Sequence, residues 1–299
     1  MPDADPNAAV EPDWNVNRGT PPFAPAIDAH VHVFPDRLAE AVQRALTAET
    51  GWEFPNRPTR EATEATLADA GVERYVALPY VHEPGRARSL NAWLAERAAD
   101  SEPLIPFATV HPDDEDVGGI VRDAFEAGAR GLKFHCPVQE CAPADPRIEP
   151  ALEAAAEYDR PITYHGGTAP MYTEDPHVGP EPFAEAVDSY PDVRVNCAHM
   201  GTYDVAEFVA MAREHDNVYL DTTFAMSTEA GRTMDFDPST IGDEVLVELS
   251  ESIMFGSDIP NIPYPYRAER AELLGRDLPT ETYRDVFYRT AEAFLGPTA

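Results

Sequence analysis

Short apolar runs alternate with longer amphipathic stretches along most of the chain. The runs are rich in β-branched residues and end at glycine, proline or polar residues, so they predict strands. Eight are present, at residues 26–34, 73–80, 104–110, 129–136, 161–167, 193–199, 218–224 and 253–258.

The stretches between these runs have apolar positions three or four residues apart, which predicts helices packed on one face. They cover residues 37–50, 60–70, 88–99, 116–127, 148–158, 181–190, 203–215, 240–250, 267–275 and 281–295. Strands that alternate with helices indicate a parallel sheet, and eight such units indicate a closed (β/α)₈ TIM barrel. A doubly wound open sheet is the alternative, but the sequence has no glycine-rich nucleotide loop to support it.

Composition adds limits to this picture. We expect a single barrel domain over residues 24–299, preceded by a disordered, acidic and proline-rich tail over residues 1–23. No apolar run approaches the ~20 residues that span a bilayer, and the start of the sequence does not resemble a secretory signal. Three cysteines form a sparse, odd set, which favours a reducing compartment, so we expect a cytoplasmic protein.

The charge is strongly acidic. Asp and Glu number 54 against 22 Lys and Arg, a formal net charge of -32, and the acids are scattered along the chain. Such a surface repels nucleic acids and anionic membranes, so neither is an expected partner. It also repels itself, which suggests adaptation to salt; a merely acidic protein is the alternative. The one lysine, Lys133, lies inside an apolar run, where a functional role is favoured.

Residues that can bind a metal fall at the ends of the predicted strands. On the first strand, Asp28, His30 and His32 occupy alternate positions and should share one face. Later strands contribute Lys133, His135, His165, His199 and Asp258. Any one of these could be a structural core residue, but a barrel brings the carboxyl ends of its strands to one mouth. Their convergence predicts a site for a divalent cation.

The stretches that carry these residues resemble the amidohydrolase superfamily, in particular its amidohydrolase-related branch of metal-dependent hydrolases and decarboxylases. They read DAHVHVF, GLKFH, PITYHGG, NCAHMG, VYLDTT and MFGSDIP. The resemblance covers residues 26–296 and includes the closing VFYRTAEAFLG, where Thr290 stands in place of the family's usual asparagine.

The resemblance implies a role for each matching residue. His30, His32 and His165 would bind the metal, and Asp258 would contact the metal or its water and act as general base or acid. His199 would assist catalysis beside one metal or bind a second one. The metal in the family is most often zinc, with manganese among the alternatives.

One metal or two is a separate question. In two-metal relatives a carboxylated lysine on the fourth strand bridges the ions, which makes Lys133, His135 and His199 candidates for a second site or for substrate contact. The GLKFH stretch is more similar to single-metal relatives. We therefore expect one metal, with Lys133 a layer deeper in the barrel than His135.

The residues leave three functions open. The first is hydrolysis of a C–N or lactone/ester bond of a small organic substrate by metal-activated water, and the second is decarboxylation or hydration. The third is metal binding without catalysis, which would leave Asp258 and His199 without a purpose. Members of the family are often dimeric, so a homodimer is also expected. Loop residues that could select the substrate, or simply pack their loops, are Trp52, Phe54, Tyr80, Arg86, Arg88, Gln139, Met171, Tyr172 and Tyr264.

Salt adaptation predicts a direction for the stability of the protein. Because added ions screen the repulsion between surface carboxylates, raising potassium chloride from about 0.1 M to about 2 M should increase the unfolding temperature. Thermal unfolding curves followed by circular dichroism measure this. An unchanged or lower unfolding temperature would leave the merely acidic alternative.

Overall fold

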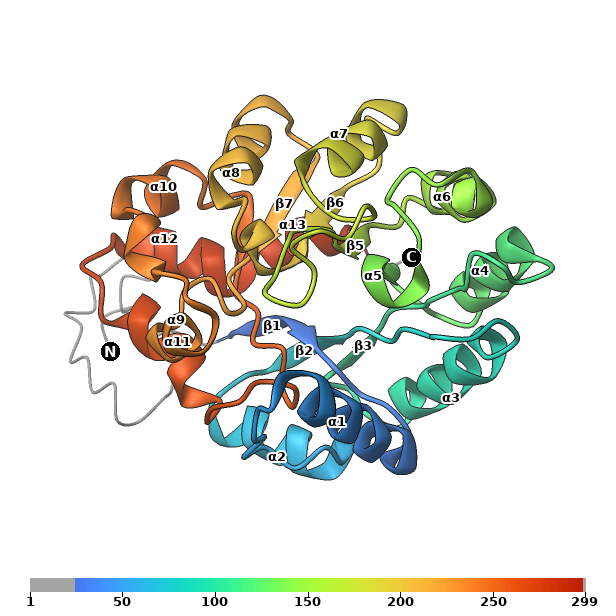
Figure 1. Cartoon of the computed structure of the whole chain (residues 1–299), viewed down its shortest axis with the longest axis horizontal. Coiled ribbons are helices and arrows are strands. Elements are labelled where there is room, and N and C mark those ends of the chain that lie inside the picture. Colours follow the sequence, from blue (N-terminus) through green and yellow to red (C-terminus); the bar gives the residue numbers. More distant parts are fainter. Residues whose placement is uncertain (1–24, 298–299) are drawn as a thin grey trace, which may run out of the picture.

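Eight parallel strands line the middle of the molecule, as the alternation predicts (Figure 1). The computed structural model describes residues 25–297, so the predicted disordered tail lies outside the described residues. The strands are β1 (Ile27–Val31), β2 (Arg74–Ala77), β3 (Leu104–Pro106), β4 (Leu132–His135), β5 (Ile162–His165), β6 (Val195–Cys197), β7 (Val218–Asp221) and β8 (Ile253–Met254).

The strands close into a barrel. β1, β2 and β3 form one sheet and β4 to β8 another, each in sequence order. Parallel bridges from Ala108 to Leu132 and from Val31 to Ile259 join the two sheets at both of their edges. The (β/α)₈ barrel expected from the sequence is therefore confirmed.

Helices surround the barrel on its outer side, except for the last one, α13, which lies across one end, and they stand where the amphipathic stretches predict them (Figure 1). They are α1 (Asp36–Thr50), α2 (Arg60–Asp69), α3 (Ala87–Ala99), α4 (Val117–Glu126), α6 (Glu149–Glu157), α7 (Pro180–Ser189), α8 (Val205–Glu214), α10 (Asp243–Glu248), α11 (Arg267–Leu274), α12 (Thr280–Arg284) and α13 (Thr290–Leu295). Shorter elements, most of them unpredicted, are α5 (Cys136–Gln139), α9 (Thr228–Met234), the 3₁₀ turns η2 (Pro146–Ile148), η3 (Ala198–Gly201) and η4 (Pro238–Thr240), and the π turn η5 (Asp285–Arg289). The last predicted helix, residues 281–295, is thus α12, η5 and α13 in succession.

The inside of the barrel is apolar at one end and polar at the other. At the apolar end, inner residues of β1, β2, β3, β7 and β8 pack against α13, whose Phe294 ring lies 5.1 Å from Tyr219 and 6.4 Å from Phe107. Thr290 of the same helix donates its hydroxyl to the Ser250 carbonyl at 2.6 Å. The helix plugs this end and leaves the opposite mouth for the polar groups.

A bulge in β1 corrects one expectation. The register of β1 against β2 shifts between Asp28 and Val31. The Asp28 carboxylate therefore turns away from the mouth and accepts hydrogen bonds from the Tyr266 hydroxyl and from the backbone N–H groups of His30 and Ser257, each at 3.1 Å. The prediction that Asp28 shares a face with the two histidines is wrong, because strict alternation fails at a bulge.

Two glycines allow the loops after β5 and β6 to touch. A Cβ atom on Gly167 would lie 2.3 Å from the Cα of Gly201, which is too close for two carbon atoms that are not bonded. Thr168 then pairs with Thr202 in a parallel bridge. This close approach brings together the ends of the strands that carry His165 and His199.

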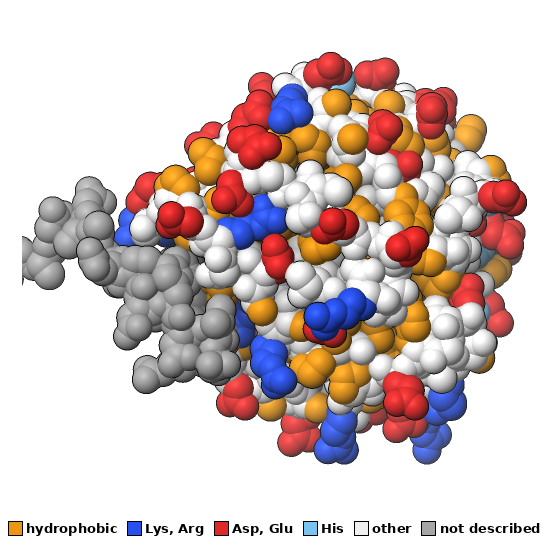
Figure 2. Space-filling view, turned by 60° about the vertical axis from the view of Figure 1, so that its left-hand side comes forward, with side chains coloured by type: hydrophobic (Ala, Val, Ile, Leu, Met, Phe, Trp, Pro, Cys, Tyr) orange, Lys and Arg blue, Asp and Glu red, His pale blue; other side chains and the backbone are white. Residues whose placement is uncertain are grey.

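Acidic side chains are spread over the surface that Figure 2 shows and are not gathered in one patch. Figure 2 shows carboxylates distributed over the face in view among fewer basic side chains, consistent with the net charge of -32. Within residues 25–297, none of the helices has the length and apolarity needed to cross a bilayer.

The Gly167 contact predicts a destabilised variant. Gly167→Ala should lower the free energy of unfolding by roughly 1–3 kcal/mol, because the new methyl group overlaps the Gly201 backbone. The control Gly275→Ala adds a Cβ in right-handed backbone with its nearest atom at 3.1 Å, so its effect should be smaller. Denaturant unfolding of both variants measures the difference, and equal effects would contradict the argument.

Candidate metal centre

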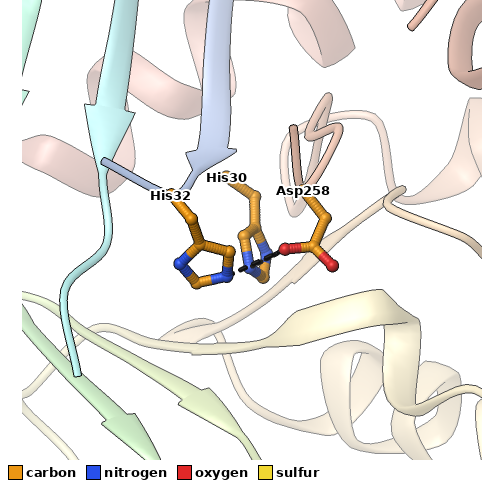
Figure 3. A group of neighbouring side chains, drawn as sticks. All are labelled: His30, His32 and Asp258. Carbon is orange, nitrogen blue, oxygen red and sulfur yellow. Dashed lines mark ion pairs between the residues drawn. The ribbon is translucent and has the colours of Figure 1, made fainter. Parts of the chain in front are cut away.

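His30 and His32 present the same ring nitrogen to the mouth of the barrel. The Nδ1–H of His30 donates to the Asp221 carboxylate at 3.0 Å, and that of His32 donates to the Leu78 carbonyl at 2.7 Å. Since both partners are acceptors, each neutral ring carries its proton on Nδ1. Both Nε2 atoms face Asp258 (Figure 3), so they are placed to bind an ion on that side of the rings.

Asp258 lies directly opposite the two rings. Its Oδ1 is 2.8 Å from His32 Nε2 and 3.6 Å from His30 Nε2. Its backbone N–H donates to the His30 carbonyl at 2.7 Å, and its φ of 61° turns the side chain inward just after β8. Burial alone would raise the pKa of this carboxyl, but the His32 and His30 rings and Lys133 outweigh burial and hold it below its usual value.

Two more histidines complete one wall of the mouth. His165 Nδ1 and His199 Nε2 are 3.1 Å apart, so one ring donates to the other. The His135 ring stacks on His165 with centroids 4.3 Å apart. The remaining nitrogens His165 Nε2, His199 Nδ1 and His135 Nδ1 are buried without a protein partner.

These buried rings are held in their neutral form. Burial is the largest cause that lowers the pKa values of His30, His165 and His199, and the nearby cationic and imidazole groups lower them further. Metal binding requires neutral imidazole, so no proton has to be displaced from these rings near neutral pH.

The donor set fits a divalent cation. Ligand atoms of His30, His32 and Asp258 lie within 4.8 Å of one another, and so do those of His30, His199 and Asp221. His165 belongs to neither group, yet its buried Nε2 lacks a partner and its ring lines the same pocket. Buried polar atoms without partners carry a free-energy cost that a bound ion would remove.

Asp221 is a functional residue that the sequence reasoning did not single out. Its carboxylate accepts four hydrogen bonds, from His30 Nδ1, Asn196 Nδ2 at 2.9 Å and the backbone N–H groups of His199 at 3.1 Å and Thr223 at 3.3 Å. With its lone pairs engaged, Asp221 orients the ligands rather than joining them. The signal was its place at the end of the seventh strand, in the VYLDTT stretch.

Lys133 occupies the layer below the histidines, as its spacing predicts. Lys133 pairs in register with Thr163, and His135 with His165 one step nearer the mouth. The lysine is fully buried and its Nζ has no protein partner. Burial lowers the pKa of Lys133, while Asp221 and Asp258 oppose that effect.

A pocket opens from this centre to the surface. It encloses about 590 Å³, a volume that includes its opening to solvent. Four of the predicted selectors line it, namely Trp52, Tyr80, Met171 and Tyr172. Leu46, Phe224, Met234 and Asn261 also line it, and no local sequence pattern predicts them.

The other predicted selectors lie elsewhere. Gln139 is buried, accepts from the His135 backbone N–H at 2.6 Å and donates to the Val110 carbonyl at 2.7 Å, so it holds a turn together. Tyr264 lies behind Phe224 and donates to Glu269. Phe54 packs beside Trp52, 6.5 Å between rings. The two arginines are exposed, Arg86 beside Glu83 and Arg88 beside Asp116 and Asp123.

Several residues of the pocket have unusual backbone. Among the described residues, eight other than glycine have positive φ, and four of them line the pocket. These four are His199, Thr202, Phe224 and Asp258. Such conformations cost free energy and concentrate at functional sites.

Comparisons with known proteins agree with this architecture. A family model described as Amidohydrolase matches residues 27–296. A search of curated proteins finds no match.

Solved structures share the fold at low sequence identity. An uncharacterised TIM-barrel protein from Bordetella bronchiseptica aligns with a TM-score of 0.70 at 17% identity, over 90% of this chain and 98% of its own. A 5-carboxyvanillate decarboxylase from Novosphingobium aromaticivorans, complexed with manganese and 4-hydroxy-3-methoxy-5-nitrobenzoic acid, gives 0.60 at 17% identity, over 90% and 95%. A putative amidohydrolase from Staphylococcus aureus gives 0.60 at 14% identity, over 91% and 99%.

The geometry of the centre predicts that His30 and His32 are needed to retain a bound metal. The wild type should hold about one ion per chain. The double variant His30→Ala/His32→Ala should lose most of this metal, because two of the ring ligands are gone. Elemental analysis after dialysis measures the ratio. His82→Ala, in an exposed loop, is the control and should keep the wild-type content. Undiminished metal in the double variant would refute the assignment.

Proposed function

The chain belongs to the amidohydrolase family, and we propose that it hydrolyses a C–N or lactone/ester bond of a small organic substrate with the help of one divalent metal. The observation that carries this proposal is the position of Asp258. Its carboxylate faces the Nε2 atoms of two candidate ligand histidines, His30 and His32, beside an open pocket. A proton acceptor beside a metal site is what water-dependent bond cleavage requires.

His30, His32, His165 and Asp258 are the residues that would hold the metal. A divalent cation in such a centre lowers the pKa of water to about 7 and polarises a carbonyl group. We propose zinc because neutral imidazole suits it, with manganese as the alternative, which the decarboxylase from Novosphingobium aromaticivorans contains. A second metal is less favoured, because Lys133, its candidate bridging residue, lies one layer below His135 and His165.

The protein's own groups divide the proton transfers. Asp258 takes the proton of the attacking water and returns it to the leaving group. If His165 uses Nε2 as a ligand, its Nδ1–H donates to His199 Nε2. His199 then carries its proton on Nδ1 and offers it to a substrate oxygen.

Decarboxylation is the second candidate. The observation in its favour is the apolar part of the pocket wall, formed by Trp52, Phe224 and Met234 among others. A carboxylate held in apolar surroundings is less well solvated than in water, which favours loss of carbon dioxide. Two assays distinguish the candidate reactions. A carbon dioxide release assay detects only decarboxylation, and a panel of amides and lactones detects only hydrolysis.

Two further expectations remain proposals. The cysteines Cys136, Cys141 and Cys197 are buried and free, which supports a reducing compartment such as the cytoplasm. A homodimer is proposed from the family alone, and its test is the molar mass in solution.

The role of Asp258 leads to a direct test. Asp258→Asn should keep part of its metal through the three histidines but lose turnover by roughly two to four orders of magnitude, because the proton acceptor is gone. Turnover is measured on the best substrate of the panel, at known metal content.

Asp159→Asn is the matched control. Asp159 also has positive φ, but its side chain is 68% exposed on the surface, so turnover should not change. Normal turnover in a fully metallated Asp258→Asn would remove this residue from catalysis.

A further inference from the structure

We propose that the pocket selects substrates with a flat apolar body that carry no acidic group away from the reacting centre. This inference rests on the proposed function, because it assigns the reacting group to the metal centre. It follows from the two walls of the pocket and from the charges around them.

The first wall is aromatic and lies beside His199. Phe224 packs edge-on against the His199 ring with centroids 5.5 Å apart, and Trp52 lies 6.2 Å from Phe224. Met234 and Leu46 extend this wall. A planar ring placed against Trp52 and Phe224 would bury apolar surface and stack favourably.

Contacts behind it fix this wall in place. Phe224 has a φ of 58°, and its backbone N–H donates to the buried Glu269 carboxyl at 3.2 Å. The Tyr264 hydroxyl donates to the other oxygen of Glu269, and the Tyr264 ring packs on Phe224 at 5.9 Å. Burial raises the pKa of Glu269 well above its usual value, while the hydrogen bonds from Tyr264 and Phe224 oppose that effect.

The second wall consists of two tyrosines. Tyr80 lies 4.9 Å from the His135 ring and 5.5 Å from His32, and Tyr172 lies 5.6 Å from His165. Both rings line the pocket, and each carries a hydroxyl group. This wall tolerates a neutral polar substituent but supplies no positive charge.

The charges exclude a second anionic group on the substrate. No lysine or arginine lines the pocket among residues 25–297. Lys133 is buried in the layer below, and Arg86 and Arg88 are paired with carboxylates outside. A distal carboxylate would lose water without gaining a partner, in a protein whose net charge of -32 already repels anions.

Two metal-binding probes test this inference without knowledge of the substrate. Benzohydroxamic acid and 4-carboxybenzohydroxamic acid share a chelating group and a ring and differ only in the distal carboxylate. The metal-loaded protein should bind the first at least about tenfold more tightly, as measured by titration calorimetry. Equal or tighter binding of the carboxylated probe, or no binding of either, would overturn the proposal.

Two variants at one position sharpen the test. Trp52→Arg places a cation in the wall and should reverse the preference, whereas Trp52→Gln removes the ring without adding charge and should weaken both probes without reversing it. Trp52 is only half-buried in a loop, and circular dichroism checks that both variants fold. An unchanged preference in Trp52→Arg would show that charge in this wall does not set the selection.

The two proposals can fail separately. The ratio between the probes tests the substrate class, and the loss of binding after metal removal tests the metal centre. Binding that does not depend on metal would count against the proposed function alone.

Discussion

The geometry of the mouth depends on the hydrogen bonds that the Asp221 carboxylate accepts. From β7 it reaches His30 on β1, Asn196 on β6 and the backbone N–H of His199, so a single buried side chain connects three strands. It fixes the proton of His30 on Nδ1 and thereby aims the opposite nitrogen at the centre. The same residue fixes the backbone of His199, which determines where the second donor lies.

Most of the fold could be predicted from the sequence, because local sequence patterns determine its strands and helices. Apolar runs and amphipathic stretches located all eight strands and the outer helices, and strand ends located the histidines and Asp258. The predictions that failed concern features that tertiary contacts determine. The bulge that turns Asp28 away from the mouth has no local signature in DAHVH, and Gln139 and Tyr264 look like pocket residues until their hydrogen-bond partners are known.

The same distinction explains why the pocket was predicted only in part. Trp52, Tyr80, Met171 and Tyr172 follow strands directly or lie in conspicuous aromatic loops. Phe224 contributes to the wall because its backbone is left-handed, and that conformation depends on Glu269, which is distant in sequence. Reaction type and substrate shape thus have different sources: the strand ends supply the chemistry, and the long-range contacts supply the walls.

The first and last strands of the barrel meet at the candidate metal centre. β1 meets the segment after β8 through the bridge from Val31 to Ile259, and the Asp258 N–H bonds to His30 at the same place. A metal held by His30, His32 and Asp258 would tie the first strand to the last and close a loop that spans nearly the whole barrel. During synthesis the ligand set is therefore incomplete until the eighth strand has left the ribosome. An ion held by this ligand set would bind only after the last strand has been made, and it would link the two ends of the barrel.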